Sequence, residues 1–191
     1  MTLRLKDSKT EPRKETSVIH YAGIMSGELS ARTRDILTQY SRIAMVGVSG
    51  NPTRASYRAL VHMQSKGYTV YPVNPSYDDI LGLKCYKSLL DIPDPVDIVD
   101  IFRRADTVIP LIGEALEVGA KVFWMQIGVV NKDAAAQAAA AGLEVVMDRC
   151  VKIEHCRFFG KKDYGLDVVG LQTGVLTSDR YECIFPGPAK P

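Results

Sequence analysis

The residues from Ile43 to Pro52 read Ile-Ala-Met-Val-Gly-Val-Ser-Gly-Asn-Pro and could hold a phosphate group. An apolar stretch breaks here into small residues and then, from Thr53, into a helix-compatible run. Glycines let backbone N–H groups approach an anion, and a following helix aims its unpaired first-turn N–H groups and positive dipole end at the same point. The spacing Gly47-x-x-Gly50 differs from the G-x-G-x-x-G of a dinucleotide site. The pattern predicts an anion-binding turn, with a turn that needs glycine for geometry alone as the alternative.

Other reactive side chains are scattered. The cysteines Cys85, Cys150, Cys156 and Cys183 show no Cys-x-x-Cys spacing, which favours a reduced, cytoplasmic protein. His155 and Cys156 are neighbours and cannot easily converge on one tetrahedral ion from a single helix, so structural roles are favoured over a metal site.

The carboxylates form no recognisable acid–base pair. Asp97 and Asp100 fall in one strand-like segment, whose ends we expect them to mark. Asp148 is expected to cap a following helix. These residues favour a binding protein without a catalytic constellation.

Strand-like and helix-like segments alternate along the chain and would position these groups. Apolar runs predict strands at residues 43–48, 69–73, 97–102, 121–126 and 143–147, with a short extended piece at 81–86. Helical patterns lie at 28–40, 54–66, 107–118, 132–141 and 148–159. The alternation calls for parallel strands with helices on both faces. We predict an α/β, Rossmann-like doubly wound parallel sheet in the order 3-2-1-4-5, with an N-terminal helix and a C-terminal tail.

The chain divides into three predicted parts. The charged opening predicts a mobile arm at residues 1–27, the alternating segments predict one binding domain at 28–159, and the remainder forms an extension at 160–191. Within the domain, the alanine-rich run after Asn131 is expected to form a tightly packed helix. Asn131 would cap its start and Gly142 would end it.

Size and charge limit the function classes. With 191 residues and 46% hydrophobic content, the chain suits one well-buried domain with extensions. A net charge of +2 gives no strong polyanion-binding field, so no nucleic-acid or membrane-surface partner is predicted. No apolar run approaches the roughly 18 residues of a membrane span, and the N-terminus lacks the apolar core of a signal peptide.

In an open parallel sheet, ligands bind beyond the carboxyl ends of the strands. Here this rim would comprise residues 48–54, 73–77, 102–106, 126–131 and 148–150. Asn74 follows the second strand where a nicotinamide dinucleotide site usually has an acidic residue, which permits a ligand phosphorylated on that ribose. Basic residues of the rim could pair with phosphates, and we expect at most two of them to contact the ligand. They are Arg54, Arg103, Arg104 and Arg149.

Five motifs together resemble the small stand-alone CoA-binding proteins, relatives of the N-terminal domain of the succinyl-CoA synthetase alpha subunit. They occupy residues 46–52 (VGVSGNP), 71–75 (YPVNP), 96–104 (VDIVDIFRR), 124–129 (WMQIGV) and 147–155 (MDRCVKIEH). The resemblance covers about residues 42–159 and leaves the arm and the tail unexplained.

The resemblance implies a site for coenzyme A (CoA) across the strand ends. Residues 49–52 would bind its phosphate, Asn74 and Pro75 would flank the nucleotide, Phe102 and Arg103 would line the adenine or pyrophosphate side, and residues 124–126 would meet the pantetheine arm. The complete candidate set is Gly47, Val48, Ser49, Gly50, Asn51, Pro52, Arg54, Asn74, Pro75, Phe102, Arg103, Arg104, Trp124, Met125, Gln126 and Gly128. The synthetases have a basic residue just after the proline-containing loop, where this chain has Ser76 and Tyr77.

Two kinds of function remain open. The first is non-catalytic binding of CoA or acyl-CoA. The second is an enzyme, either the CoA-binding part of a split acyl-CoA ligase with a partner chain or a nucleotide-dependent redox protein; a homo-oligomer is also open. The synthetases phosphorylate a histidine in a second domain, whereas structural or surface roles are favoured here for His20, His62 and His155. Cys150 lies near a helix N-terminus beside Arg149, a setting that lowers a thiol pKa, so a mixed disulfide with CoA is the alternative to a buried structural cysteine.

Overall fold

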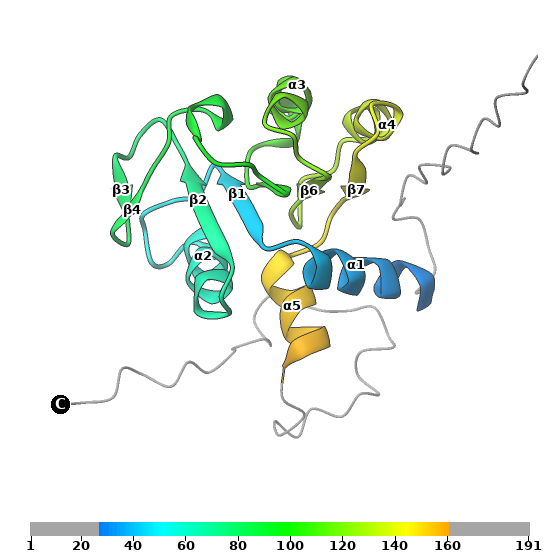
Figure 1. The fold of residues 1–191 in the computed structure, drawn as a ribbon, viewed down its shortest axis with the longest axis horizontal. Coiled ribbons are helices and arrows are strands. Elements are labelled where there is room, and N and C mark those ends of the chain that lie inside the picture. The colour runs from blue at the N-terminus through cyan, green and yellow to red at the C-terminus, as the bar shows by residue number, and fades with distance from the viewer. Residues whose placement is uncertain (1–26, 161–191) are drawn as a thin grey trace, which may run out of the picture.

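A five-stranded parallel sheet forms the centre of the computed structural model, which describes residues 27–160 (Figure 1). Its strands are β1 (Arg42–Val46), β2 (Thr69–Val73), β5 (Ile98–Ile101), β6 (Val122–Met125) and β7 (Glu144–Val146). Every residue of β5 and β6 is buried. Strands that are buried along their whole length are typical of a parallel sheet that is covered on both faces.

Helices cover the two faces of the sheet (Figure 1). One face carries α1 (Gly27–Gln39), α2 (Ala55–Ser65) and α5 (Val151–Phe159). The other carries α3 (Pro110–Glu117) and α4 (Lys132–Ala140). The predicted α/β doubly wound architecture is therefore confirmed.

The predicted strand order is wrong. The observed order is β2-β1-β5-β6-β7, so β5 pairs with β1 instead of lying outside β2. Tyr86 occupies the outer side of β2, where its N–H donates to the carbonyl of Pro72 over 2.8 Å. Proline has no N–H for a ladder and is confined to edge strands, so Pro72 was a signal in the sequence that β2 is not central.

The connection between β2 and β5 contains no α-helix. It forms a small antiparallel pair, β3 (Asp79–Ile80) and β4 (Leu83–Lys84), and a 3₁₀ turn, η1 (Leu89–Asp91). Another 3₁₀ turn, η2 (Ala105–Thr107), precedes α3, which starts at Pro110 and therefore later than predicted.

The alanine-rich helix α4 begins and ends as predicted. The Asn131 side chain accepts a hydrogen bond from Ala134 N–H over 2.9 Å, and Gly142 has a φ of +94° just beyond the helix. Four of its alanines are buried against the sheet, which allows the close approach that small side chains permit.

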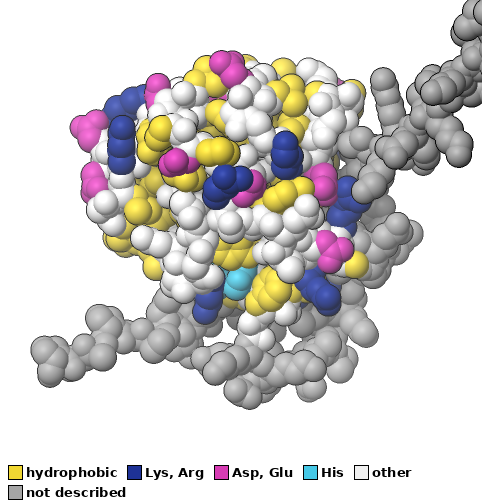
Figure 2. Space-filling model, viewed as in Figure 1, with side chains coloured by type: hydrophobic (Ala, Val, Ile, Leu, Met, Phe, Trp, Pro, Cys, Tyr) yellow, Lys and Arg dark blue, Asp and Glu magenta, His cyan; other side chains and the backbone are white. Residues whose placement is uncertain are grey.

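The arm predicted at residues 1–27 and the extension predicted at 160–191 lie outside the described residues, except Gly27 and Gly160. Within the described part, no helix is long and apolar enough to cross a bilayer. On the face shown in Figure 2, the coloured Lys and Arg side chains alternate with Asp and Glu, without a broad basic patch. A cytoplasmic location and the lack of a nucleic-acid partner remain predictions.

Candidate functional site

The bend after β1 needs glycine at its first position. Gly47 has a φ of +84°, a left-handed conformation that favours glycine, and its N–H donates to Val73 O over 2.8 Å. A Cβ at this position would lie 3.0 Å from Arg103 Cγ. Gly47 therefore lets the segment after β5 pack directly on the bend.

Three N–H groups of the bend donate hydrogen bonds to side chains of the bend and of the first turn of α2. Ser49 N–H donates to Ser56 Oγ over 3.1 Å, Asn51 N–H donates to Ser49 Oγ over 3.1 Å, and Thr53 N–H donates to Asn51 Oδ1 over 2.9 Å. These bonds fix the path from β1 into α2. They also mean that the bend is partly occupied by the chain's own groups.

The start of α2 remains open to an anion. Its N-cap residue Arg54 makes no side-chain capping bond. Among the described residues, no hydrogen-bond partner is found for the N–H groups of Gly50, Ala55, Ser56 and Tyr57. Unbonded N–H groups at a helix start and the positive end of the helix dipole are the features that favour phosphate binding.

The loop after β2 packs on this bend. Asn74 Nδ2 donates to Val48 O over 2.7 Å, and the Tyr77 hydroxyl lies 3.5 Å from Ser49 Oγ. The Tyr77 ring is so close to Gly50 that a Cβ there would be 2.8 Å from Tyr77 Cε1. Tyr77, which sequence reasoning noted as a departure from the synthetase pattern, thus forms one wall of the site.

A basic residue reaches the same loop from farther along the chain. Lys87 Nζ donates to Pro75 O over 3.2 Å and to Tyr77 O over 2.8 Å, and it pairs with Asp78 over 2.7 Å. Sequence reasoning missed Lys87 because it looked for a cation immediately after Pro75. Only the turn through β3 and β4 brings the lysine back.

The four rim arginines divide into two kinds. Arg104 pairs with Asp106 over 2.6 Å, and Arg149 pairs with the buried Glu154 over 2.8 Å. No ion pair is found in the described structure for Arg54 or Arg103, both of which are exposed. This division leaves Arg54 and Arg103 as the arginines available to a phosphorylated ligand.

The segment after β6 contributes less side-chain surface than the sequence predicted. Trp124 and Met125 are 0% exposed, and Trp124 Nε1 donates to Arg149 O over 2.7 Å. Their side chains belong to the core, so only their backbone could reach a ligand. Gly128, with a φ of +82°, donates its N–H to Asp148 Oδ1 over 2.8 Å and ties this segment to the one after β7.

The remaining candidates have simple positions. Phe102 is half-buried at the end of β5 and packs on the core layer that contains α2, whereas Pro52 and Pro75 are exposed. Asp148 adopts a φ of +58°, which is unusual for a residue with a side chain. It does not directly precede α5; Cys150 is the N-cap residue there.

Asp100 does not mark a strand end. It lies inside β5, is 0% exposed, and its Oδ1 accepts a 2.6 Å hydrogen bond from Gln126 Nε2. Burial raises the pKa of Asp100 to about 8, because little solvent is left to stabilise its charge. Sequence reasoning missed this pair, whose members are twenty-six residues apart.

Cys150 is not an activated thiol. Burial raises its pKa, the nearby Asp100 raises it further, and the Arg149 guanidinium that was expected to lower it is bound to Glu154. Cys85 is a free and buried thiol. Cys156 is disulfide-bonded in the structure, so the prediction of four reduced cysteines is wrong for this residue.

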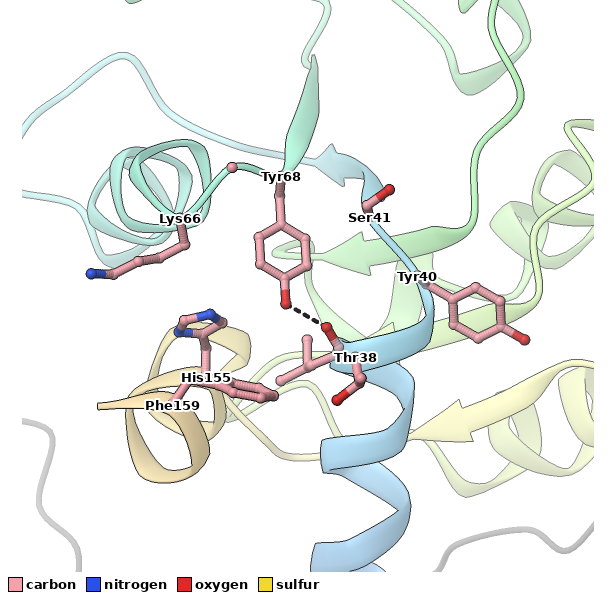
Figure 3. A pocket seen from close by; sticks show the side chains of 9 residues that line it. Thr38, Tyr40, Ser41, Lys66, Tyr68, His155 and Phe159 are labelled. Atoms are coloured by element: carbon pink, nitrogen blue, oxygen red, sulfur yellow. Dashed lines mark hydrogen bonds between the residues drawn. The ribbon is translucent and has the colours of Figure 1, made fainter. Parts of the chain in front are cut away.

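A cavity of about 370 Å³ lies at the opposite, amino-terminal edge of the sheet (Figure 3). Its lining includes Tyr40, Lys66, Tyr68 and Phe159, and the Tyr68 hydroxyl donates to Leu37 O over 2.6 Å. The predicted site residues do not line it. The candidate site is therefore the rim at the carboxyl ends of the strands.

Comparisons with known proteins agree with this fold. The chain is 41% identical over 131 residues to "Uncharacterized protein YneT" of Bacillus subtilis (strain 168), covering 69% of this chain and 97% of the relative. A solved structure titled as a hypothetical protein from Pyrococcus horikoshii OT3 matches with a TM-score of 0.67 and 40% identity, covering 73% of this chain and 98% of that one.

A shorter match relates the chain to larger proteins. Over 59 residues, 31% of this chain, it is 37% identical to the ADP-forming acetate–CoA ligase of Methanocaldococcus jannaschii, of which the match spans 8%. A family model described as "CoA binding domain" matches residues 41–156. Because this match covers more than half of the sequence, the chain belongs to the CoA-binding domain family.

Proposed function

We propose that this protein binds CoA or acyl-CoA at the carboxyl edge of its sheet without catalysing a reaction on it. The observation that carries the proposal is the open start of α2, flanked by two exposed arginines that form no ion pair within residues 27–160, in a chain of the CoA-binding family. The N–H groups of residues 50 and 55–57 would meet the diphosphate. Arg54 and Arg103 would supply the charge-assisted bonds.

The rest of the ligand would extend along the rim. Asn74 and Pro75 would border the nucleotide, and Phe102 would offer an apolar surface to the adenine. Gly128 and the backbone around Gln126 would border the pantetheine arm. Asn74, in place of a carboxylate, favours CoA over a nicotinamide dinucleotide.

A second candidate function is the CoA-binding part of a split acyl-CoA ligase that acts with a partner chain. The matches to several ADP-forming ligases favour it. Turnover would appear as acyl-CoA, nucleoside diphosphate and phosphate formed from CoA, an organic acid and a nucleoside triphosphate, or as the reverse reaction from acyl-CoA, nucleoside diphosphate and phosphate. Binding of CoA without turnover, in protein purified with any chain that copurifies with it, supports the non-catalytic proposal.

Thermal shift and isothermal titration calorimetry with CoA, acetyl-CoA and NADH test the proposal. We expect CoA and acetyl-CoA to raise the melting temperature and NADH to leave it unchanged, because ligand binding stabilises the folded state by mass action. Stabilisation by NADH with none by CoA would overturn the proposal.

Replacing the unpaired arginines should weaken CoA binding. Arg54→Ala or Arg103→Ala should each raise the Kd for CoA about tenfold, since a charge-assisted bond contributes roughly 1.5–3 kcal/mol and about 1.4 kcal/mol is tenfold. Lys121→Ala is the matched control, because Lys121 is exposed just before β6, at the other edge of the sheet. Equal losses in all three variants would argue for a general charge effect instead of this site.

A further inference from the structure

Asp100 is an ionisable side chain with an unmet hydrogen-bonding capacity. Asp100 is 0% exposed. Its Oδ2 atom is completely buried, and no hydrogen-bond partner is found for it among the described residues. Leaving a buried polar atom unbonded costs about 1–3 kcal/mol. An aliphatic side chain would avoid that cost, so a structural role alone does not explain a carboxyl group here.

The one side chain that bonds Asp100 in the described structure is Gln126, which directly follows β6 at the carboxyl edge. Side chains alternate along strands, and Asp100 and Gln126 point to the same face as Ile98 and Trp124. Gln126 is 4% exposed. Gln126 Oε1 has no hydrogen-bond partner among residues 27–160 and, unlike Asp100 Oδ2, is not completely buried. This oxygen therefore remains available to accept a hydrogen bond at the rim.

Few other titratable groups act on this pair. The neighbours of Asp100 in register are Met45 on β1 and Trp124 on β6, neither of which titrates. From the start of α5, the Cys150 thiol interacts with Asp100 electrostatically. Arg149 is already held by Glu154. Asp148, on the same segment, binds Gly128.

We propose that Asp100 is a positioning residue for Gln126, and that the Gln126 amide hydrogen-bonds a secondary amide of the pantetheine arm. This inference rests on the proposed function and adds a determinant for the arm. Ionised Asp100 accepts from Nε2 and leaves Oε1 for an N–H of the arm. Protonated Asp100 can donate its O–H to Oε1 after the amide turns over, which leaves N–H for a carbonyl of the arm.

The test separates the arm from the nucleotide. Calorimetry on the full chain compares S-methyl-CoA, whose thioether cannot ionise, with 3′-phosphoadenosine 5′-diphosphate, which lacks the arm. The ratio of the two Kd values measures what the arm contributes. The free terminal phosphate of the armless nucleotide titrates near neutral pH and the esterified diphosphate of S-methyl-CoA does not, so the same ratio measured in Asp100→Asn is the reference for any pH effect.

Asp100→Leu should lower this arm contribution about tenfold while affinity for the armless nucleotide stays within about twofold, the scale of one lost hydrogen bond. Asp100→Asn should retain it, because its Oδ1 can still accept from Gln126 Nε2. Relative to Asp100→Asn, whose side chain at this position does not titrate, the contribution of the pantetheine arm in wild type should differ between about pH 6.5 and pH 9, because ionised and protonated Asp100 leave different atoms of Gln126 for the arm.

Two further variants guard against misfolding. Val99→Ala controls for lost stability in β5, since Val99 packs in the opposite core layer. Gln126→Leu should lose the same arm contribution, and adding Asp100→Leu to it should cost no more. An arm contribution that is unchanged in Asp100→Leu and Gln126→Leu would overturn the inference while CoA binding stands. Wild type that binds neither ligand would instead refute the proposed function.

Discussion

Two buried histidines, His62 on α2 and His155 on α5, form a contact that the sequence did not reveal. His62 Nε2 lies 3.1 Å from His155 Nδ1, and the residues are 2% and 7% exposed. Burial lowers the pKa of both imidazoles, that of His62 to about 4, and the neighbouring Lys66 lowers them further. Both histidines are therefore neutral at neutral pH, and together they join α2 to α5.

Acid should weaken this junction. The folded-state pKa of His62 lies below its usual 6.5, so the unfolded chain binds more protons as the pH falls from about 6.5 to about 4, and stability drops in that window. The melting temperature of wild type should fall by roughly 5 °C there, at about 2–4 °C per kcal/mol. In the double variant His62→Gln/His155→Gln, the melting temperature measured by differential scanning calorimetry should fall clearly less steeply with decreasing pH. An equally steep fall in wild type and variant would contradict this role of the histidines.

Individual residues were predictable where a local pattern determines them. The glycines of the bend and the Asn131 cap depend on neighbours in the sequence, and their geometry follows from backbone chemistry. Asp100, Lys87 and the histidine pair depend on contacts across the fold, so the sequence around each of them carried no signal.

The structural elements were largely predictable, and their arrangement was less so. The spacing of apolar residues along the sequence predicted the five strands of the parallel sheet and its covering helices. The predicted strand order was wrong at β2, because it followed the usual topology and did not use Pro72. Proline lacks a backbone N–H and is therefore confined to edge strands within a sheet.

The junction of the first two rim loops can be tested by a double-mutant cycle. Gly50→Ala puts a Cβ 2.8 Å from the Tyr77 ring, which must then move. We expect a loss of about 1–3 kcal/mol, as for other overpacked sites, together with weaker CoA binding. In a Tyr77→Ala background the same change should cost little stability. Denaturant unfolding measures the loss of stability in the two backgrounds. An equal cost in the two backgrounds would show that the ring is not the obstacle.

For the whole molecule, charge and sheet geometry act together. A net charge of +2 offers little long-range attraction to an anion. The proposed site therefore depends on local donors at one edge of the sheet. Among the described residues, both core layers and all candidate residues lie between residues 36 and 151. A single binding domain at 28–159 stays a prediction.

This concentration predicts that residues 27–160 bind CoA without the flanking segments. The truncated chain should keep the Kd for CoA within about twofold of the full chain, because the candidate contacts come from the parallel sheet and its loops. Calorimetry on both chains checks this, with circular dichroism to confirm folding. A folded truncated chain with a much weaker Kd would assign part of the site to the flanking segments.

The two outer strands bear on how the protein behaves at high concentration. Strand β7 has three residues, and its Glu144 is engaged by Arg32 over 3.0 Å. On β2, the outward carbonyl of Pro72 is already taken by Tyr86, and proline offers no donor beside it. In the described part of the chain, neither outer strand presents a long row of unpaired backbone groups to a strand from another molecule, so concentrated solutions should resist fibrillar aggregation.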